Sequence, residues 1–396
     1  MNFIFISPNF PRIYSHFVKS LHDRGVNVLG IGDEPYDQLS QELKENLTEY
    51  CYVSNMSNLD WMKNTVDYLK GKYGQIDYIE SNNEFWLFSD SYLREHINCP
   101  NGFRPDEMNK IKYKSQMKEY FEKAGVKTAR YILSGDLEKS LEFVKKVGYP
   151  VFAKPDDGVG AASTFKIKNI EDLKSFHEVT QGQNYIIEEY IDGFITSFDG
   201  ICDDDSNVVL AFNETFPTPI AEVVNKKTDV YYYAKAEMPK DFYEMGCRVV
   251  KSFGIKKRCF HIEFFKLNNN KEGLGKKGDI VAIEVNMRSP GGNTPDLLCL
   301  ALNGSYYDVY ADTIAFNKSD ISKYNDKYIS ISVNKKYDFQ YAHTHEEISS
   351  KYNDSIKERG CYPKDFRDAM GDEFYFARFK TLEEALEFEK FVHEKK

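Results

Sequence analysis

The sequence lacks any long run of apolar residues. No stretch of its 396 residues approaches the ~18 consecutive apolar residues that a membrane-spanning helix requires. The first ten residues, MNFIFISPNF, contain neither the basic start nor the long apolar centre of a secretory leader. We therefore expect no membrane segment and a cytoplasmic location.

Closely spaced cysteine pairs are absent as well. The seven cysteines are scattered, and no two of them have the CxxC spacing of structural zinc sites. Their odd number and wide separation give no disulfide framework, so we expect reduced thiols. The formal net charge of -10 argues against a nucleic-acid-binding surface. The length leaves room for two or three packed units.

The phosphate-binding fingerprint GxGxxG is missing from the N-terminal region. Residues 1–105 alternate between expected strands and helices, which is typical of a doubly wound parallel sheet. The first strand runs into SPNFP, where a dinucleotide-binding fold carries its glycines, so we predict no nicotinamide site. The expected strands cover residues 2–7, 26–31 and 76–81, and the expected helices cover 13–24, 60–73 and 85–95.

One loop of this region has the position of a ligand-binding loop. The residues Ser81 to Glu84 follow the third expected strand, and ligands bind at the carboxyl ends of strands in such sheets. The same segment also suits helix capping by Asn82 or Asn83. Both interpretations remain open at this point.

A row of polar side chains lies at the end of an expected strand over residues 280–287. Side chains alternate between the two faces of a strand, so Glu284, Asn286 and Arg288 share one face. A half-buried strand rarely places three successive polar groups on one side without a function for them. The acid and the amide offer hard oxygen ligands for Mg²⁺, and the arginine suits a phosphate or a carboxylate. The core-facing side is expected to carry Ile283, Val285 and Met287.

A second apolar strand is expected just upstream, over residues 259–267. On it, His261, Glu263 and Phe265 share one face. An antiparallel pairing of the two strands brings Glu263 beside Glu284, and adjacent carboxylates repel unless a cation or a proton lies between them. The alternative is a solvated, outward-facing strand face. The core-facing side is expected to carry Phe260, Ile262 and Phe264.

The motifs HIEFF (residues 261–265) and IEVNMR (residues 283–288) together resemble the metal-binding end of the ATP-grasp superfamily. The resemblance is to the carboxylate–amine ligase type, with a core like those of the carbamoyl-phosphate synthase large subunit and biotin carboxylase. It implies that ATP is a substrate and that Mg²⁺ or Mn²⁺, with two ions expected, is held by Glu263, Glu284 and Asn286. It also implies a catalytic Arg288 that steadies the transferred phosphate or the carboxylate.

An upstream lysine resembles a phosphate contact of the same superfamily. In several members a lysine eleven residues before a helix-ending glycine contacts the ATP phosphates, and counting back from Gly125 gives Lys114. Three further lysines leave the register open by one turn: Lys110, Lys112 and Lys118.

Lys154 is the one charge in the apolar strand YPVFAK, and the loop DGVGAAST follows it closely. In the superfamily a Lys-Pro pair and a loop of small residues form the lid over the triphosphate, which implies that Lys154, Gly158 and Gly160 bind ATP. A glycine loop can place backbone N–H groups over phosphates. Alone, the loop would be an ordinary tight turn, and it lacks the helix and the GK[ST] ending of a P-loop.

The segment NYIIEEYIDG (residues 184–193) resembles the hinge that holds adenine. The resemblance implies that Glu188 accepts a hydrogen bond from the adenine amino group and that the backbone around Ile191 binds the ring edge, with Glu189 and Tyr190 between them. The alternative is a strand end with exposed carboxylates.

The sequence departs from the superfamily at the ribose position. An acid or a histidine usually follows the first hinge glutamate by seven or eight residues, but Ile195 and Thr196 stand there. Ribose recognition is therefore expected to be weaker, or to use Asp199 or Glu189.

The remaining elements complete the expected order. A proline-containing loop over residues 208–228 is expected to border the acceptor site. His343 and His345 share one face of an extended segment, but no third ligand is near, so no metal is expected there. The expected helices cover residues 106–125, 140–147, 238–253, 294–315 and 381–394, and the expected C-terminal strands cover 328–333 and 373–379.

These segments predict three units. Residues 1–105 form an α/β doubly wound parallel-sheet domain. Residues 106–317 form an α+β ATP-grasp core whose two subdomains clasp ATP, with the lid subdomain at about 125–190. Residues 318–396 form a small α+β C-terminal unit that closes the enzyme or joins two copies in a homodimer.

The resemblance implies a ligase that joins a small-molecule carboxylate to an amine through an acyl phosphate and releases ADP and phosphate. Two alternatives stay open: a bicarbonate-activating, carboxylase-like ATP-grasp enzyme, and a non-catalytic nucleotide-binding sensor. Nothing in the sequence marks a biotinyl partner or a carbamate acceptor, and a sensor need not keep Glu263, Glu284 and Asn286 together.

Overall fold

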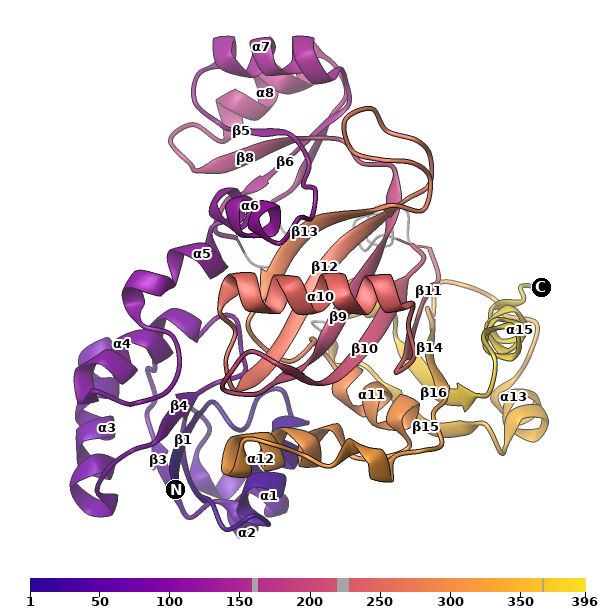
Figure 1. The fold of residues 1–396 in the computed structure, drawn as a ribbon. Helices are drawn as coiled ribbons and strands as arrows, with labels where there is room; N and C mark the ends of the chain where they lie inside the picture. The colour runs from indigo at the N-terminus through magenta and orange to yellow at the C-terminus, as the bar shows by residue number, and fades with distance from the viewer. Residues whose placement is uncertain (159–162, 219–227, 365–366) are drawn as a thin grey trace.

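The computed structural model describes residues 1–158, 163–218, 228–364 and 367–396, and Figure 1 shows their arrangement. Three sheets organise the chain: a parallel four-stranded sheet near the N-terminus, an antiparallel four-stranded sheet, and a central antiparallel eight-stranded sheet. None of the helices in these ranges combines the length and the apolar character needed to cross a lipid bilayer.

The first sheet has the parallel, doubly wound architecture that the sequence predicted. Its strands are β1 (Asn2–Ile6), β2 (Asn27–Gly32), β3 (Glu49–Tyr52) and β4 (Tyr78–Glu80), and its helices are α1 (Tyr14–His22), α2 (Gln41–Asn46), α3 (Leu59–Tyr73) and α4 (Leu87–Ile97). All neighbours run parallel, in the order β3-β2-β1-β4. Phe3 and Phe5 of β1 pack with α1, whereas Ile4 and Ile6 pack with α3 and α4, so helices cover both faces. The sequence pattern did not predict β3, which is short and only partly buried.

The second sheet forms a small unit of its own, at the top of Figure 1. Its strands are β5 (Tyr131–Leu133), β6 (Val151–Pro155), β7 (Phe165–Ile167) and β8 (Tyr185–Glu189), in the antiparallel order β5-β8-β6-β7. Two helices pack on it, α7 (Leu137–Val147) and α8 (Ile170–Val179). The sequence pattern did not predict α8, although the Asn169 side chain caps it by accepting from the Asp172 N–H group at 2.8 Å.

The central sheet runs in the order β13-β12-β9-β10-β11-β14-β16-β15. Its strands are β9 (Gly193–Cys202), β10 (Val208–Phe216), β11 (Val230–Lys235), β12 (Arg258–Leu267), β13 (Ile280–Asn286), β14 (Ile329–Lys335), β15 (Ile356–Cys361) and β16 (Glu373–Phe379). The expectation of a loop from residue 208 is wrong for β10, because Leu210 and Phe212 are buried in the core and draw this segment into the sheet. The C-terminal strands continue the same sheet, since β14 pairs with β11.

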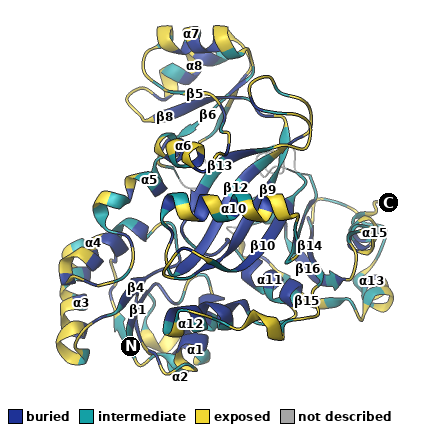
Figure 2. Ribbon diagram, in the orientation of Figure 1, coloured by how far each residue is buried: buried dark blue, intermediate teal, exposed yellow. Residues whose placement is uncertain are grey.

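Helices cover both faces of the central sheet, and Figure 2 shows the strands beneath them as buried. The helix α10 (Lys240–Phe253) packs on one face together with Phe198 and Phe260. On the other face α11 (Thr294–Leu302) and α12 (Tyr306–Phe316) pack between the sheet and α1. The C-terminal helices are α13 (His345–Tyr352), the short α14 (Arg367–Met370) and α15 (Leu382–His393). A capping box of Thr381 and Glu384 begins α15.

Two stretches predicted as single helices are each divided. Residues 294–315 separate into α11 and α12, because Asn303 has a left-handed conformation (φ 53°) and Gly304 lies so close to the Tyr324 ring that a Cβ atom would come within 2.2 Å of it. Residues 106–125 separate because Tyr113 is extended (ψ 117°). The resulting pieces are a 3₁₀ turn (Pro105–Glu107), α5 (Asn109–Lys112) and α6 (Lys114–Lys123).

A buried ion-pair cluster joins the N-terminal sheet to the central sheet. Glu80 at the end of β4 accepts hydrogen bonds from Arg94 of α4, at 3.2 Å, and from Arg258 at the start of β12. None of these three side chains is more than 5% exposed. A buried carboxylate is tolerated only with such partners, so the cluster fixes how the two sheets meet.

Replacing Arg258 with methionine should destabilise the fold by about 3 kcal/mol, because Glu80 would stay buried with one of its two cations removed. Urea unfolding monitored by circular dichroism measures the change in the free energy of unfolding. The control is the double variant Arg258→Met, Glu80→Gln, which should lose less stability than the single variant. Equal losses in both would contradict the ion-pair account.

Candidate active site

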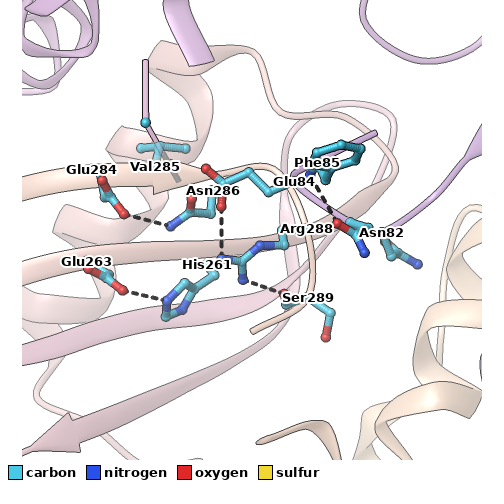
Figure 3. Close-up of polar contacts among 12 residues, drawn as sticks. Asn82, Glu84, Phe85, His261, Glu263, Glu284, Val285, Asn286, Arg288 and Ser289 are labelled. Atoms are coloured by element: carbon cyan, nitrogen blue, oxygen red, sulfur yellow. Dashed lines mark hydrogen bonds and ion pairs between the residues drawn. The ribbon is translucent and has the colours of Figure 1, made fainter. Parts of the chain in front are cut away.

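The end of the central sheet places the two predicted acids opposite each other. In the pairing of β12 with β13, Glu263 is the direct partner of Glu284, and His261 is the partner of Asn286. Directly opposed residues on antiparallel strands have Cβ atoms only about 5 Å apart. The sequence pattern predicted this juxtaposition, and Figure 3 shows these side chains side by side at the strand ends.

One detail of the strand prediction is wrong, because Ile283 does not lie in the core-facing row. The pairing passes from Glu263–Glu284 to Phe264–Ala282 and omits Ile283, which marks a β-bulge. The extra residue shifts the alternation of inward and outward side chains by one position. Ala282 therefore lies in the same core as Val285 and Met287, whereas Ile283 stays partly exposed. Counting alternate residues along a strand cannot detect such an insertion.

Glu263 is held by a buried chain of polar side chains. His261 Nε2 lies 2.9 Å from Glu263 Oε1, and His261 Nδ1 contacts the carboxylate of Asp199 on β9. Ser197 donates to the second oxygen of Asp199 at 2.5 Å. Burial opposes a charged imidazole, but Asp199 and then Glu263 raise the pKa of His261 to about 10. The sequence placed His261 on this face without a role; here it occupies one oxygen of Glu263 and leaves the other for a ligand.

Lys114 reaches the opposed acids from the start of α6. Its ammonium lies 3.5 Å from Glu284 Oε2 and donates to the carbonyl of Gly158 at 2.6 Å. The helix break at Tyr113 allows Lys114 to take this position. The backbone carbonyl of Asp156, just after β6, holds the break by accepting from the Lys114 N–H group at 2.9 Å. Lys110 pairs instead with Glu107, at 3.4 Å. The other predicted lid glycine, Gly160, lies outside the described residues.

Glu188 lies between two lysines. Its Oε1 is 2.5 Å from Lys118 Nζ, and its Oε2 is 2.8 Å from Lys154 Nζ. Burial would raise the pKa of Glu188, but the two ammonium groups lower it to about 2. The structure therefore brings the predicted Lys154 and Glu188 together, and it adds Lys118, which the sequence left as one option within an open register.

The other hinge residues have separate surroundings. Glu189 contacts Arg130 through both carboxylate oxygens, at 3.0 and 2.6 Å. The Lys166 ammonium lies 4.0 Å from the centre of the Tyr190 ring, and Ile191 is buried. Successive side chains of β8 point to opposite faces of the sheet, so the Glu189 carboxylate does not lie beside Lys118 and Lys154 with the Glu188 carboxylate.

Neither ribose candidate is free in the structure. Glu189 is engaged with Arg130, and Asp199 is fully buried against His261. The sequence suggested Glu189 and Asp199 because they lie near the hinge. Position along the chain does not reveal which other side chains they contact.

Arg288 is paired with the N-terminal domain. Its Nη2 lies 3.1 Å from Glu84 Oε2, and its Nη1 donates to the carbonyl of Ser289 at 2.9 Å (Figure 3). Glu84 belongs to the loop after β4 that the sequence marked as either ligand-binding or helix-capping. Asn83 accepts from the Phe85 N–H group at 3.0 Å and closes a turn, but α4 begins after Trp86 without a side-chain cap, so the expected helix capping is wrong. Glu84 turns toward the strand ends.

The opposed acids suit a divalent cation. Burial and the neighbouring Glu263 raise the pKa of Glu284, so a cation bound beside it would favour its charged form. Carboxylate and amide oxygens are the ligands that Mg²⁺ prefers, so Asn286 completes a fitting donor set. Among the described residues no group of three or more acidic, histidine or cysteine side chains is placed to hold a metal ion.

Residues 147–295 match the ATP-grasp domain. The chain contains an ATP-grasp domain. The match begins at the end of α7, includes Lys154, the hinge and both acid-bearing strands, and ends in α11. Lys114 and Glu84 lie outside the matched part of the ATP-grasp domain.

Curated relatives match the chain over short lengths. A D-alanine–D-alanine ligase B from Clostridium perfringens is 33% identical over 122 residues, which is 30% of this chain and 36% of that protein. A phosphoribosylamine–glycine ligase from Clostridium acetobutylicum is 35% identical over 99 residues, 23% of this chain and 24% of that protein. The chain thus spans about a third or less of the length of these relatives.

A solved structure resembles the whole chain. The crystal structure of an L-amino acid ligase from Bacillus licheniformis has a TM-score of 0.72, with 14% sequence identity, over 99% of this chain and 96% of that one. At this identity the likeness shows a shared fold, over the matched domain and the flanking units alike.

The ion pairs of Glu188 predict a specific acid sensitivity. Its folded pKa of about 2 lies below the ~4.3 of an unfolded glutamate, so Glu188 stabilises the fold above pH ~4 and this contribution is lost as the pH falls toward 2. The contribution corresponds to about 3 kcal/mol. Urea unfolding at several pH values should show Glu188→Gln less stable than wild type by about this amount at pH 7, with the gap closing in acid.

The control for this experiment is Glu119→Gln, because Glu119 is 68% exposed and pairs with its helical neighbour Lys123. It should follow the wild-type stability at every pH. A Glu188→Gln gap that stays constant from pH 7 to pH 3 would contradict the assignment.

Proposed function

We propose that the protein is a cytoplasmic, ATP- and Mg²⁺-dependent ligase that joins a carboxylate to an amine through an acyl phosphate, releasing ADP and phosphate. The observation that carries this proposal is the direct opposition of Glu263 and Glu284 beside the ammonium of Lys114. Two acids for a metal next to cations for phosphate are what the transfer of a γ-phosphate requires. The relatives' names support the class, since those given above are all ligases.

The proposed metal set is Glu263, Glu284 and Asn286, with two Mg²⁺ or Mn²⁺ ions. Bound metal would neutralise phosphate oxygens and orient the γ-phosphate. His261 holds one oxygen of Glu263, so that acid offers its second oxygen to the metal. This leaves Glu284, at the centre of the set, as the acid whose loss should matter most.

The proposed nucleotide contacts come from both sides of the site. Lys114 and Lys154 would bind the phosphates, and the hinge from Glu188 to Ile191 would receive adenine. The backbone at Gly158 and Gly160 would cover the triphosphate as a lid. The small sheet of β5 to β8 supports a lid subdomain at about 125–190, between a domain at 1–105 and a C-terminal unit at 318–396.

An ADP-release screen over pairs of acids and amines with Mg²⁺ tests the proposal. Release that requires one added acid and one added amine supports the ligase. Release that requires bicarbonate alone would favour the carboxylase-like alternative, and nucleotide binding without turnover on any pair would favour the sensor.

We expect Glu284→Gln to lower ADP release by ~100-fold or more, because a neutral amide cannot replace an anionic metal ligand. Its melting temperature should equal or exceed that of wild type, since the change removes a carboxylate that burial and Glu263 disfavour. The control is Glu244→Gln, an exposed acid on α10, which should retain full activity. A fully active Glu284→Gln enzyme would disprove the metal assignment.

We expect Arg288→Lys to bind MgATP almost normally but to lower kcat by ~100-fold, because a planar guanidinium can span two oxygens of an acyl-phosphate-like transition state and an ammonium cannot. The competing role is structural, in which Arg288 only braces the Glu84 loop. In that case the melting temperature should fall while the single-turnover rate per folded enzyme stays unchanged. Both quantities should be measured on one preparation.

A further inference from the structure

Glu84 and Arg288 form an ion pair that a ligand can reach. The two residues are 204 positions apart in sequence and join the loop after β4 to the end of β13. Their side chains are 19% and 18% exposed, unlike the buried pair of Glu80 and Arg258. Within the described ranges, Arg288 is the single polar partner of the Glu84 carboxylate. Glu84 and Arg288 therefore pair with each other, and both side chains remain partly accessible to solvent.

A substrate carboxylate that takes Arg288 must displace Glu84. A simple carboxylate would then leave Glu84 without a cation, close enough to Glu284 for the two charges to repel. A molecule with an ammonium next to its carboxylate avoids this cost, because it offers an anion to Arg288 and a cation to Glu84 at once. Such a zwitterion replaces one ion pair by two and leaves no charge unpaired.

We propose that the carboxylate donor is a zwitterionic amino acid, whose carboxylate binds Arg288 and whose ammonium binds Glu84. This assignment rests on the proposed ligase function and makes Glu84 the residue that selects the donor. The zwitterion is the substrate whose carboxylate is phosphorylated, because Arg288 lies two residues after Asn286, at the metal-binding end of β13.

The chemistry agrees with this orientation. A carboxylate oxygen of the donor forms a bond to the γ-phosphorus, the bond from that phosphorus to the β-phosphate oxygen breaks, and ADP leaves. The acceptor amine then bonds to the carbonyl carbon, phosphate leaves with the electron pair of the broken C–O bond, and the extra proton on nitrogen passes to solvent. An ammonium held by Glu84 has no lone pair, so the donor's own nitrogen cannot act as the acceptor.

Trapping with hydroxylamine isolates the donor step, because hydroxylamine replaces the acceptor amine and converts the acyl phosphate to a hydroxamate. Each amino acid is compared with its 2-deamino analogue, for example alanine with propionate, in the presence of MgATP. Wild-type enzyme should accept at least one amino acid with a kcat/KM ~100-fold or more above that of its analogue, because the analogue that takes Arg288 would leave the Glu84 charge unpaired near Glu284.

The Glu84→Gln variant should lose most of this preference by slowing the amino acid reaction, while the analogue reacts no slower than before. The matched control is Glu95→Gln, an exposed acid on α4 of the same domain, which should keep the wild-type preference. A melting curve confirms that each variant is folded. A second measurement, the KM for MgATP, should not change in Glu84→Gln.

The outcomes separate the two claims. If deaminated acids react as well as amino acids in wild type, or if Glu84→Gln keeps the preference, the donor assignment is overturned while the ligase function stands. If no acid of either kind gives ADP and hydroxamate, the proposed function fails and the donor assignment fails with it.

Discussion

Two carboxylates that face each other across neighbouring strands impose the main electrostatic constraint on this molecule. Glu263 and Glu284 are cross-strand partners in a largely buried position, where like charges repel strongly. The compensating charge comes from separate parts of the chain: Lys114 from the helix before the small sheet, Lys154 from that sheet, and His261 from the strand of Glu263 itself. The charges of the two acids are therefore offset by cations that come together where the small sheet meets the central sheet.

The N-terminal domain is attached at the same end of the β12–β13 pair. Because the strands are antiparallel, Arg258 at the start of β12 and Arg288 just after β13 lie at one edge, and both bind acids from one short segment of the N-terminal domain. The contact at Glu80 is buried and fixed, whereas the contact at Glu84, four residues later, is open to solvent. A rigid anchor next to an exchangeable contact is an arrangement that holds a binding group in position before the ligand arrives.

The sequence predicted the parts of the site that depend on local pattern. Alternation along two strands was enough to place Glu263 beside Glu284, and the order of motifs was enough for the ATP-grasp fold. It failed where distant segments decide the outcome. The break before Lys114 depends on Asp156, and the partner of Arg288 is a glutamate from another domain, so neither pattern is visible in the local sequence. The bulge at Ile283 escaped detection because one inserted residue leaves the composition of a strand unchanged.

The pairing of β14 with β11 has a consequence for how the chain is made. During synthesis, β11 emerges from the ribosome almost a hundred residues before its neighbour β14, and β15 and β16 follow later still. Until then one side of β11 has open hydrogen-bonding groups, and an open strand edge invites pairing with other chains. A chain that stopped near residue 320 would hold the complete acid pair and still carry this edge permanently. The C-terminal strands therefore cover the open edge of β11 once they are made, although they lie far from the chemistry.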